Sequence, residues 1–193
     1  MFILDGGWLR DAQRIESPNC DERPVTAVSM IVVHAISLPP SQFGSGDIAR
    51  LFTNTLDPEE HPYFSGIHQL RVSAHFLIRR DGALIQFVSC LQRAWHAGLS
   101  CWNGRERCND FSIGIELEGS DDTPFEGAQY KQLLVLIKKL CDEFPIEVVV
   151  GHSDISPGRK TDPGPYFEWQ RLAELGQKIK TVVKLEPSQN RIN

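Results

Sequence analysis

Residues 28–34 form an almost unbroken apolar run, Val-Ser-Met-Ile-Val-Val-His, in which both faces of an extended chain are largely apolar. A run of this kind is typical of a central strand that is covered on both sides. Residues 73–80 and 83–89 flank Asp81-Gly82, a strong signal for a two-residue hairpin. Further strands are predicted at residues 111–118, where apolar and polar side chains alternate, and at 146–150, a short β-branched run.

Helical periodicity is clearest over residues 130–144, where apolar side chains recur three and four positions apart and form one stripe. Thr123-Pro124-Phe125-Glu126 precedes this stripe and resembles a capping box, although the helix could begin a few residues later. We expect a shorter helix at residues 47–54 and a last helix at about 166–183. Strands separated by helices, together with a hairpin, predict an α/β fold with a central mixed sheet flanked by α-helices.

The domain organisation follows from length and composition. A chain of 193 residues with no shift in composition is predicted to be a single domain, residues 1–193, with its core at about 27–182. Residues 17–26 are polar and rich in turn formers, so we expect a loop there. Residues 186–193 are predicted to be a flexible tail.

Charge and hydropathy exclude several classes of protein. The net charge of −5 argues against a nucleic-acid-binding module, which usually carries a basic patch. No apolar run is long enough for a membrane span, and the first residues lack the features of a signal peptide. The five cysteines are an odd number without an export signal, so we expect reduced thiols in a cytoplasmic protein and assign no role to any of them.

Three residues at or beyond predicted strand ends could hold a metal ion. His34 and His152 each end a strand, and Asp162 follows ten residues after His152. Two imidazoles and a carboxylate are a plausible open zinc site whose fourth position holds water. A histidine at a strand end is more often a hydrogen-bonded core residue, and four other histidines compete for the same role: His61, His68, His75 and His96.

Two further residues could assist chemistry beside such a site. Glu116 lies on the polar face of the strand at 111–118, but Glu118 shares that face and the pattern does not separate them. Lys160 lies two residues before Asp162, so in an extended segment both side chains point the same way. The ordinary interpretation of each residue is a solvated charge.

Several longer stretches together resemble one protein family. They are Ile-Val-Val-His (31–34), Ser-Ala-His-Phe-Leu-Ile (73–78), Arg-Ala-Trp-His-Ala-Gly (93–98), the sixteen residues 104–119, and Gly-His-Ser-Asp-Ile-Ser-Pro-Gly-Arg-Lys-Thr-Asp-Pro-Gly-Pro (151–165). The sequence resembles the zinc N-acetylmuramoyl-L-alanine amidases, whose fold is shared by phage T7 lysozyme and the peptidoglycan recognition proteins. Residues 37–40 and 57–64 also resemble the bacterial cytoplasmic subgroup that cuts 1,6-anhydro-N-acetylmuramoyl-L-alanine linkages during cell-wall recycling.

The resemblance implies roles for matching positions. His34, His152 and Asp162 match the ligands of one zinc ion, Glu116 matches the general base, and Lys160 matches the residue that steadies the tetrahedral intermediate. Arg71, Trp95 and Arg107 are expected to line the substrate groove. The expected partner is a small muropeptide, bound by a monomer that contacts neither nucleic acid nor membrane.

One departure from the family pattern concerns the residue after His34. Close relatives usually carry asparagine there to hold the sugar, whereas this chain has Ala35, whose side chain makes no hydrogen bond. Two alternatives to a recycling amidase stay open: an endolysin-like amidase that lyses polymeric murein, and a non-catalytic peptidoglycan-binding module. Such modules commonly replace a zinc ligand, and here all three ligand types are present.

Overall fold

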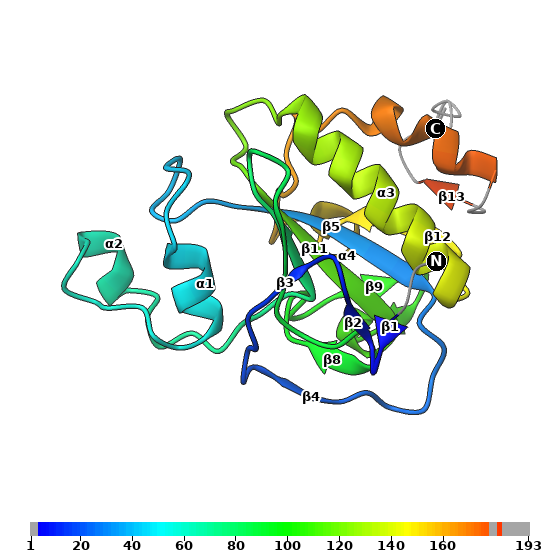
Figure 1. Cartoon of the computed structure of the whole chain (residues 1–193), viewed down its shortest axis with the longest axis horizontal. Helices are drawn as coiled ribbons and strands as arrows, with labels where there is room; N and C mark the ends of the chain where they lie inside the picture. Colours follow the sequence, from blue (N-terminus) through cyan, green and yellow to red (C-terminus); the bar gives the residue numbers. More distant parts are fainter. Residues whose placement is uncertain (1–3, 178–180, 183–193) are drawn as a thin grey trace.

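A seven-stranded mixed sheet forms the centre of the molecule (Figure 1). The computed structural model describes residues 4–177 and 181–182. The strand order is β13-β12-β5-β11-β6-β7-β3. The bounds are Thr181–Val182 (β13), Val148–Gly151 (β12), Met30–Ile36 (β5), Ser112–Glu118 (β11), Phe76–Ile78 (β6), Leu84–Gln86 (β7) and Gln13–Arg14 (β3). Among the described strands of this sheet, β6 and β7 form the one antiparallel pair, so the prediction of a mixed sheet with helices on its faces is confirmed.

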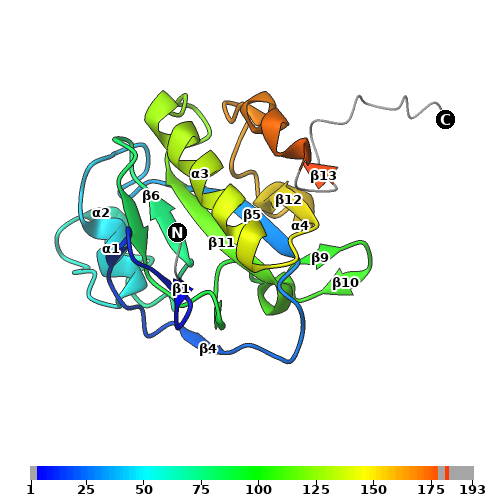
Figure 2. The ribbon, with the colours of Figure 1, turned by 45° about the vertical axis from the view of Figure 1, so that its right-hand side comes forward.

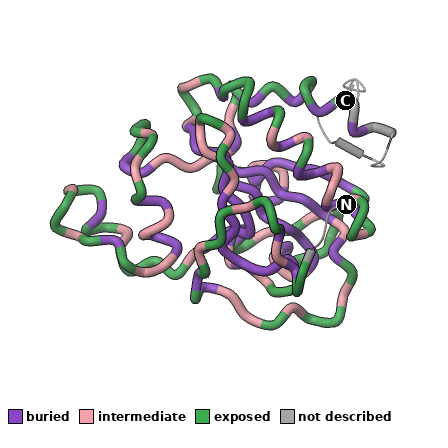
Figure 3. The backbone as a smooth tube through the Cα atoms, viewed as in Figure 1, coloured by how far each residue is buried: buried purple, intermediate pink, exposed green. Residues whose placement is uncertain are grey.

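Strand β5 occupies the central position that its apolar run predicts. It lies between β12 and β11, and its residues from Met30 to His34 are all buried. Figure 3 shows the buried residues gathered along these central strands. In the parallel register of β5 with β11, His34 pairs with Glu116. Paired residues of neighbouring strands point to the same face, so the fold places these two side chains next to each other.

Helix α3 (Gly127–Glu143) covers one face of the sheet (Figure 2). Its apolar stripe packs on the side chains that β5 and β11 direct to that face, including Ile31, Val33 and Ile115. The capping box is made by Glu126 and Gln129. The helix therefore begins a few residues after the predicted start, because Glu126 rather than Thr123 is the N-cap.

The opposite face of the sheet carries the even-numbered residues of β5. Met30 and Val32 pack there against Ile155 of the short helix α4 (His152–Ile155) and against Ala97. Three two-stranded sheets surround this core. Their strands are Leu4–Asp5 (β1) with Trp8–Leu9 (β2), Cys20–Glu22 (β4) with Gln92–Ala94 (β8), and Cys101–Trp102 (β9) with Arg105–Glu106 (β10).

A lobe to one side of the sheet is built by α1 (Asp47–Phe52) and α2 (Pro62–Ser65), on the left of Figure 1. Its apolar side chains form a core of their own with residues of β6 and β7. Helix α1 ends two residues before the predicted Asn54, which adopts a left-handed conformation with φ 60°. Asparagine tolerates that conformation, which is incompatible with continuing the helix.

Two sequence predictions need correction. The predicted loop at residues 17–26 contains strand β4, whose partner β8 lies about seventy residues further along the chain and leaves no local signal. The predicted last helix at 166–183 is instead a 3₁₀ helix, Trp169–Gln177, followed by the short strand β13. The β-branched pair Thr181-Val182 extends the sheet beside β12. The predicted tail at 186–193 lies outside the described residues.

The predicted hairpin around Asp81-Gly82 is confirmed, with β6 and β7 shorter than the apolar runs. Gly82 has φ 87°, a conformation that glycine adopts without strain. Within the described residues, every helix is too short or too polar to cross a membrane.

Candidate active site

A pocket of about 400 Å³ opens where β5, β11 and β12 end. Four of the residues predicted from the sequence line it together: His34 from β5, Glu116 from β11, His152 at the start of α4, and Asp162 from the loop that follows α4. The N–H of Ser153 donates to the carbonyl of Asp162, which ties this loop to α4. Residues distant in sequence thus meet at one end of the sheet.

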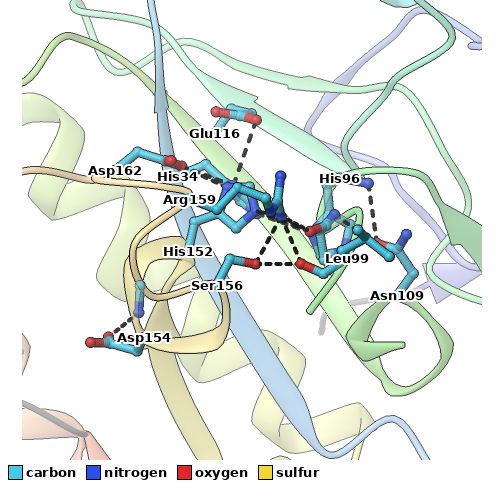
Figure 4. Close-up of polar contacts among 12 residues, drawn as sticks. His34, His96, Leu99, Asn109, Glu116, His152, Asp154, Ser156, Arg159 and Asp162 are labelled. Carbon is cyan, nitrogen blue, oxygen red and sulfur yellow. Dashed lines mark hydrogen bonds and ion pairs between the residues drawn. The ribbon is translucent and has the colours of Figure 1, made fainter. Parts of the chain in front are cut away.

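Three potential ligand atoms, from His34, His152 and Asp162, lie close together in the pocket (Figure 4). Nδ1 of His34 lies 3.0 Å from Nδ1 of His152, and both lie 3.1 Å from Oδ2 of Asp162. They form the only group of three or more metal-ligating side chains found within residues 4–177 and 181–182. The competing histidines lie outside this group. His61 caps α2 with its side chain, His68 contacts backbone carbonyls of α2, and His75 and His96 are buried nearby.

The protonation states fit a metal ion. Nε2 of His152 lies 3.1 Å from the carbonyl oxygen of Ala97, which can only accept, so Nε2 carries the proton and Nδ1 presents a lone pair. Burial lowers the pKa of His34 to about 4, so its imidazole is neutral near pH 7. Two imidazole nitrogens and a carboxylate oxygen are a donor set that suits a divalent cation such as zinc. The residues present therefore fit the expected group.

Glu116 lies beside this cluster, with Oε1 4.0 Å from Nδ1 of His34. Its Oε2 is buried and has no hydrogen-bond partner. Burial raises the pKa of Glu116 well above its usual range, and the carboxylate of Asp162 adds to this effect, while Lys160 opposes it. A buried carboxylate with a raised pKa is suited to proton transfer near neutral pH.

The structure separates Glu116 from Glu118, which the sequence pattern did not. Both are buried, but the carboxylate of Glu118 accepts the backbone N–H groups of Gly44 at 2.6 Å and Arg80 at 3.2 Å. It also lies 3.8 Å from Nε of Arg79. Glu118 thus anchors the loop after β5 to the sheet, whereas Glu116 faces the pocket.

The other predicted site residues differ in how close they lie to the pocket. Lys160 and Trp95 line the pocket. Arg71 is exposed beside the pocket-lining residues Leu70 and Val72. Arg107 lies elsewhere, in a second hollow with Leu99 and Arg159, and its Nε is 3.4 Å from Oδ2 of Asp110.

One wall of the pocket was not predicted residue by residue. Leu38, Tyr63 and Ile67, from the loop after β5 and from the lobe of α1 and α2, also line the pocket. The sequence held one signal for this wall: residues 37–40 and 57–64 resemble the cell-wall recycling subgroup. That resemblance assigned no role to any residue in these two segments. Residues 97–99 and Arg159, which pack behind His152, were also missed.

Comparison with known proteins agrees with this arrangement. The family model of N-acetylmuramoyl-L-alanine amidase (Amidase_2) matches residues 24–165. The chain is 54% identical to the 1,6-anhydro-N-acetylmuramyl-L-alanine amidase AmpD of Citrobacter freundii, over 90% of this chain and 95% of that protein. Identity to AmpD of Escherichia coli K12 is 53%, over 93% of this chain and 100% of that protein.

Solved structures of N-acetylmuramoyl-L-alanine amidases also resemble this chain. A crystal structure of a selenomethionine derivative of AmpD superimposes with a TM-score of 0.86 at 54% identity, covering 90% of this chain and 98% of that chain. A complex of E. coli AmiD with anhydro-N-acetylmuramic acid-L-Ala-D-γ-Glu-L-Lys has a TM-score of 0.57 at 29% identity, covering 91% of this chain and 65% of that chain. This chain belongs to the N-acetylmuramoyl-L-alanine amidase family.

Proposed function

We propose that this protein hydrolyses the amide bond between the lactyl group of 1,6-anhydro-N-acetylmuramic acid and L-alanine in muropeptides released during peptidoglycan recycling. The convergence of Nδ1 of His34, Nδ1 of His152 and Oδ2 of Asp162 beside the unpartnered carboxylate of Glu116 carries the proposal of a metal-dependent hydrolase. The names of the AmpD relatives, 53–54% identical over nearly their full length, support the substrate.

In this proposal one zinc ion is held by His34, His152 and Asp162. Zinc at such a site supplies Lewis acidity, which lowers the pKa of water from 15.7 to about 7 and polarises a carbonyl oxygen. The family to which the chain belongs supports zinc, and the donor set of two imidazoles and a carboxylate is one that zinc accepts.

Glu116 acts as the general base. Its carboxylate accepts a proton from the attacking water and then donates it to the nitrogen of L-alanine as the C–N bond breaks. The raised pKa of Glu116 makes the protonated form accessible for this second step. No covalent intermediate with the enzyme is required, so no cysteine takes part.

Lys160 stabilises the negative charge that develops on the carbonyl oxygen. Its ammonium group lies on the pocket wall within electrostatic range of both Glu116 and His34. A cation placed where negative charge develops stabilises the transition state more than the ground state, and so it lowers the barrier.

The substrate occupies the pocket between the metal ligands and the α1–α2 lobe. Trp95 offers an apolar contact surface, and Arg71 at its margin offers a cation for the carboxylates of the peptide stem. Arg107 would reach the substrate only if the stem extends to the second hollow. Ala35 lines the pocket without a polar side-chain atom, so we expect weaker sugar binding than an asparagine would give. The cytoplasmic location and the monomeric state stay predictions.

Turnover of a 1,6-anhydromuramoyl tripeptide tests the proposal. Metal-stripped protein is compared with the same sample after zinc is restored, and release of the free peptide is measured. We expect release only with zinc, and much faster than release of peptide from intact sacculi. Equal activity on sacculi would favour an endolysin-like amidase, and folded, zinc-loaded protein that releases no peptide would favour a binding module.

A further inference from the structure

Both candidate histidine ligands point Nδ1 toward the pocket. The Nε2 atoms of both rings point to the same dipeptide, His96-Ala97. Nε2 of His34 lies 2.9 Å from Nδ1 of His96, and Nε2 of His152 lies 3.1 Å from the carbonyl oxygen of Ala97. His96 and Ala97 are both buried and lie just after β8, separated from it by Trp95. One short segment therefore contacts the rear of both imidazoles.

The direction of each hydrogen bond at His96 is set by a chain of contacts that begins at the carbonyl of Cys108 and runs through Ser112 to His96. The carbonyl of Cys108 can only accept, and it lies 2.6 Å from Oγ of Ser112, so the serine hydroxyl donates its single proton there. Oγ of Ser112 must then accept from Nε2 of His96 at 3.3 Å. Nδ1 of His96 is left as an acceptor, and Nε2 of His34 must carry the proton. This relay leaves Nδ1 of His34 with a lone pair that faces Asp162.

The segment itself is held from two sides (Figure 4). Oδ1 of Asn109 accepts the backbone N–H of His96 at 3.2 Å and that of Ala97 at 2.8 Å. Nη2 of Arg159 donates to the carbonyls of Ala97 and Leu99, both at 2.8 Å. The carbonyl of Ala97 has two lone pairs, so it accepts from Arg159 and His152 together.

The sheet leaves space for the ring of His96. A Cβ atom added to Gly114 of β11 would lie 2.4 Å from Cγ of His96, far inside contact distance. The ring of His96 therefore packs directly on the backbone of the strand that carries Glu116, and its position is fixed by packing as well as by hydrogen bonds.

We infer that the His96–Ala97 segment orients both metal-binding histidines and fixes their tautomers, with His96 as a positioning residue that acts through His34. The inference rests on the metal site of the proposed function. Groups of this kind, behind the ligands, typically change metal affinity by about 10- to 100-fold when they are removed.

The test compares zinc affinity among variants, measured on metal-stripped protein by competition with a chelating dye. His96→Leu is expected to weaken zinc binding by about 10- to 100-fold. His96→Asn places an acceptor oxygen at the position of Nδ1 and is expected to recover most of the affinity. A folded His96→Leu variant with the affinity of the wild type would overturn the inference.

A milder substitution covers the case in which His96→Leu does not fold. Ser112→Ala removes the acceptor for Nε2 of His96 together with the hydrogen bond to Cys108, and it is expected to weaken zinc binding severalfold. Ser17→Ala is the matched control, because Oγ of Ser17 is also buried and donates to a carbonyl, that of Phe52, but its other partner is the N–H of Asn19 rather than a histidine. Equal zinc affinity in Ser112→Ala and Ser17→Ala would contradict the relay.

Imidazole nitrogen chemical shifts of the metal-free protein provide a readout that needs neither zinc nor activity. We expect His34 in the tautomer protonated at Nε2 in the wild type and a mixture of tautomers in His96→Leu or Ser112→Ala. A wild-type His34 protonated at Nδ1 would refute the inference. A wild type that does not bind zinc but shows the expected tautomers would instead refute the proposed metal site and leave the relay supported.

Discussion

His75, a histidine outside the proposed metal site, is expected to make the stability of this protein depend on pH. The ring is fully buried, and its Nδ1 accepts the backbone N–H of Gly114 at 3.0 Å. Its Nε2 therefore carries the proton and donates to the carbonyl of Gln92 at 3.1 Å. Nη2 of Arg23 also lies 3.1 Å from Nε2, but it donates to the same carbonyl at 2.7 Å. Protonating Nδ1 would set two N–H groups against each other and add a buried charge beside Arg23.

The expected magnitude follows from this environment. Burial lowers the pKa of His75 to about 3 from an ordinary value of 6.5, and the charge of Arg23 adds to the effect. Between these values the unfolded chain binds one more proton than the folded protein, so stability falls as the pH decreases below 6.5. At 1.36 kcal/mol per pH unit, this one residue lowers the free energy of unfolding by about 2 kcal/mol at pH 5.

Denaturant unfolding of the metal-free protein at pH 7.5 and pH 5 measures this loss. The comparison variant is His75→Asn, whose side-chain oxygen can accept the N–H of Gly114 but does not titrate. The other titratable groups contribute equally to both proteins, so their contributions cancel in the difference. We expect the wild type to lose about 2 kcal/mol more than the variant between these two pH values. Equal losses in the two proteins would refute the assignment of a neutral, buried His75.

Three further predictions concern the site, a neighbouring loop and the core. Asp162→Ala removes the single carboxylate ligand, so metal analysis should find it depleted of zinc and inactive; full zinc occupancy would exclude Asp162 as a ligand. Glu118→Ala leaves the N–H groups of Gly44 and Arg80 without acceptors and should cost about 1–3 kcal/mol in the free energy of unfolding while raising KM more than it lowers kcat; an unchanged midpoint in denaturant would argue against this anchor. Leu133→Ala opens a cavity between α3 and the sheet and should cost about 2–5 kcal/mol, measured by the same unfolding experiment, whereas a loss below 1 kcal/mol would contradict the packing of α3.

The sheet and its main helix could be predicted because their signals are local. The apolar run at 28–34, the Asp81-Gly82 turn and the stripe of α3 each depend on neighbouring residues. Strand β4 and the short strand β13 could not be predicted, since each is two or three residues long and exists only because a distant strand lies beside it. Over a stretch as short as Trp169–Gln177, the apolar spacing of a 3₁₀ helix resembles that of an α-helix. The sequence pattern therefore did not distinguish the two kinds of helix.

The candidate site shows the same division between local and long-range information. The prediction that His34 ends its strand was wrong by two residues, because β5 continues to Ile36, whereas His152 directly follows β12. Only the parallel register of β5 with β11 pairs His34 with Glu116 rather than with Glu118. Spacing alone did not distinguish the two histidines of the proposed metal site from His96, because the distinction depends on which ring nitrogen faces which partner. Arg107 carries a suitable charge, yet its loop turns it toward a second hollow.

Turnover of Glu116→Gln, measured on a zinc-loaded sample whose metal content is determined in parallel, tests the central claim most directly. The substitution keeps the size of the side chain and removes its ability to take a proton, while the three metal ligands stay intact. Zinc content equal to that of the wild type is expected, with kcat on the 1,6-anhydromuramoyl tripeptide reduced by about 10²- to 10⁴-fold. A variant that retains zinc and turns over at the rate of the wild type would contradict the role of Glu116 as general base in this pocket.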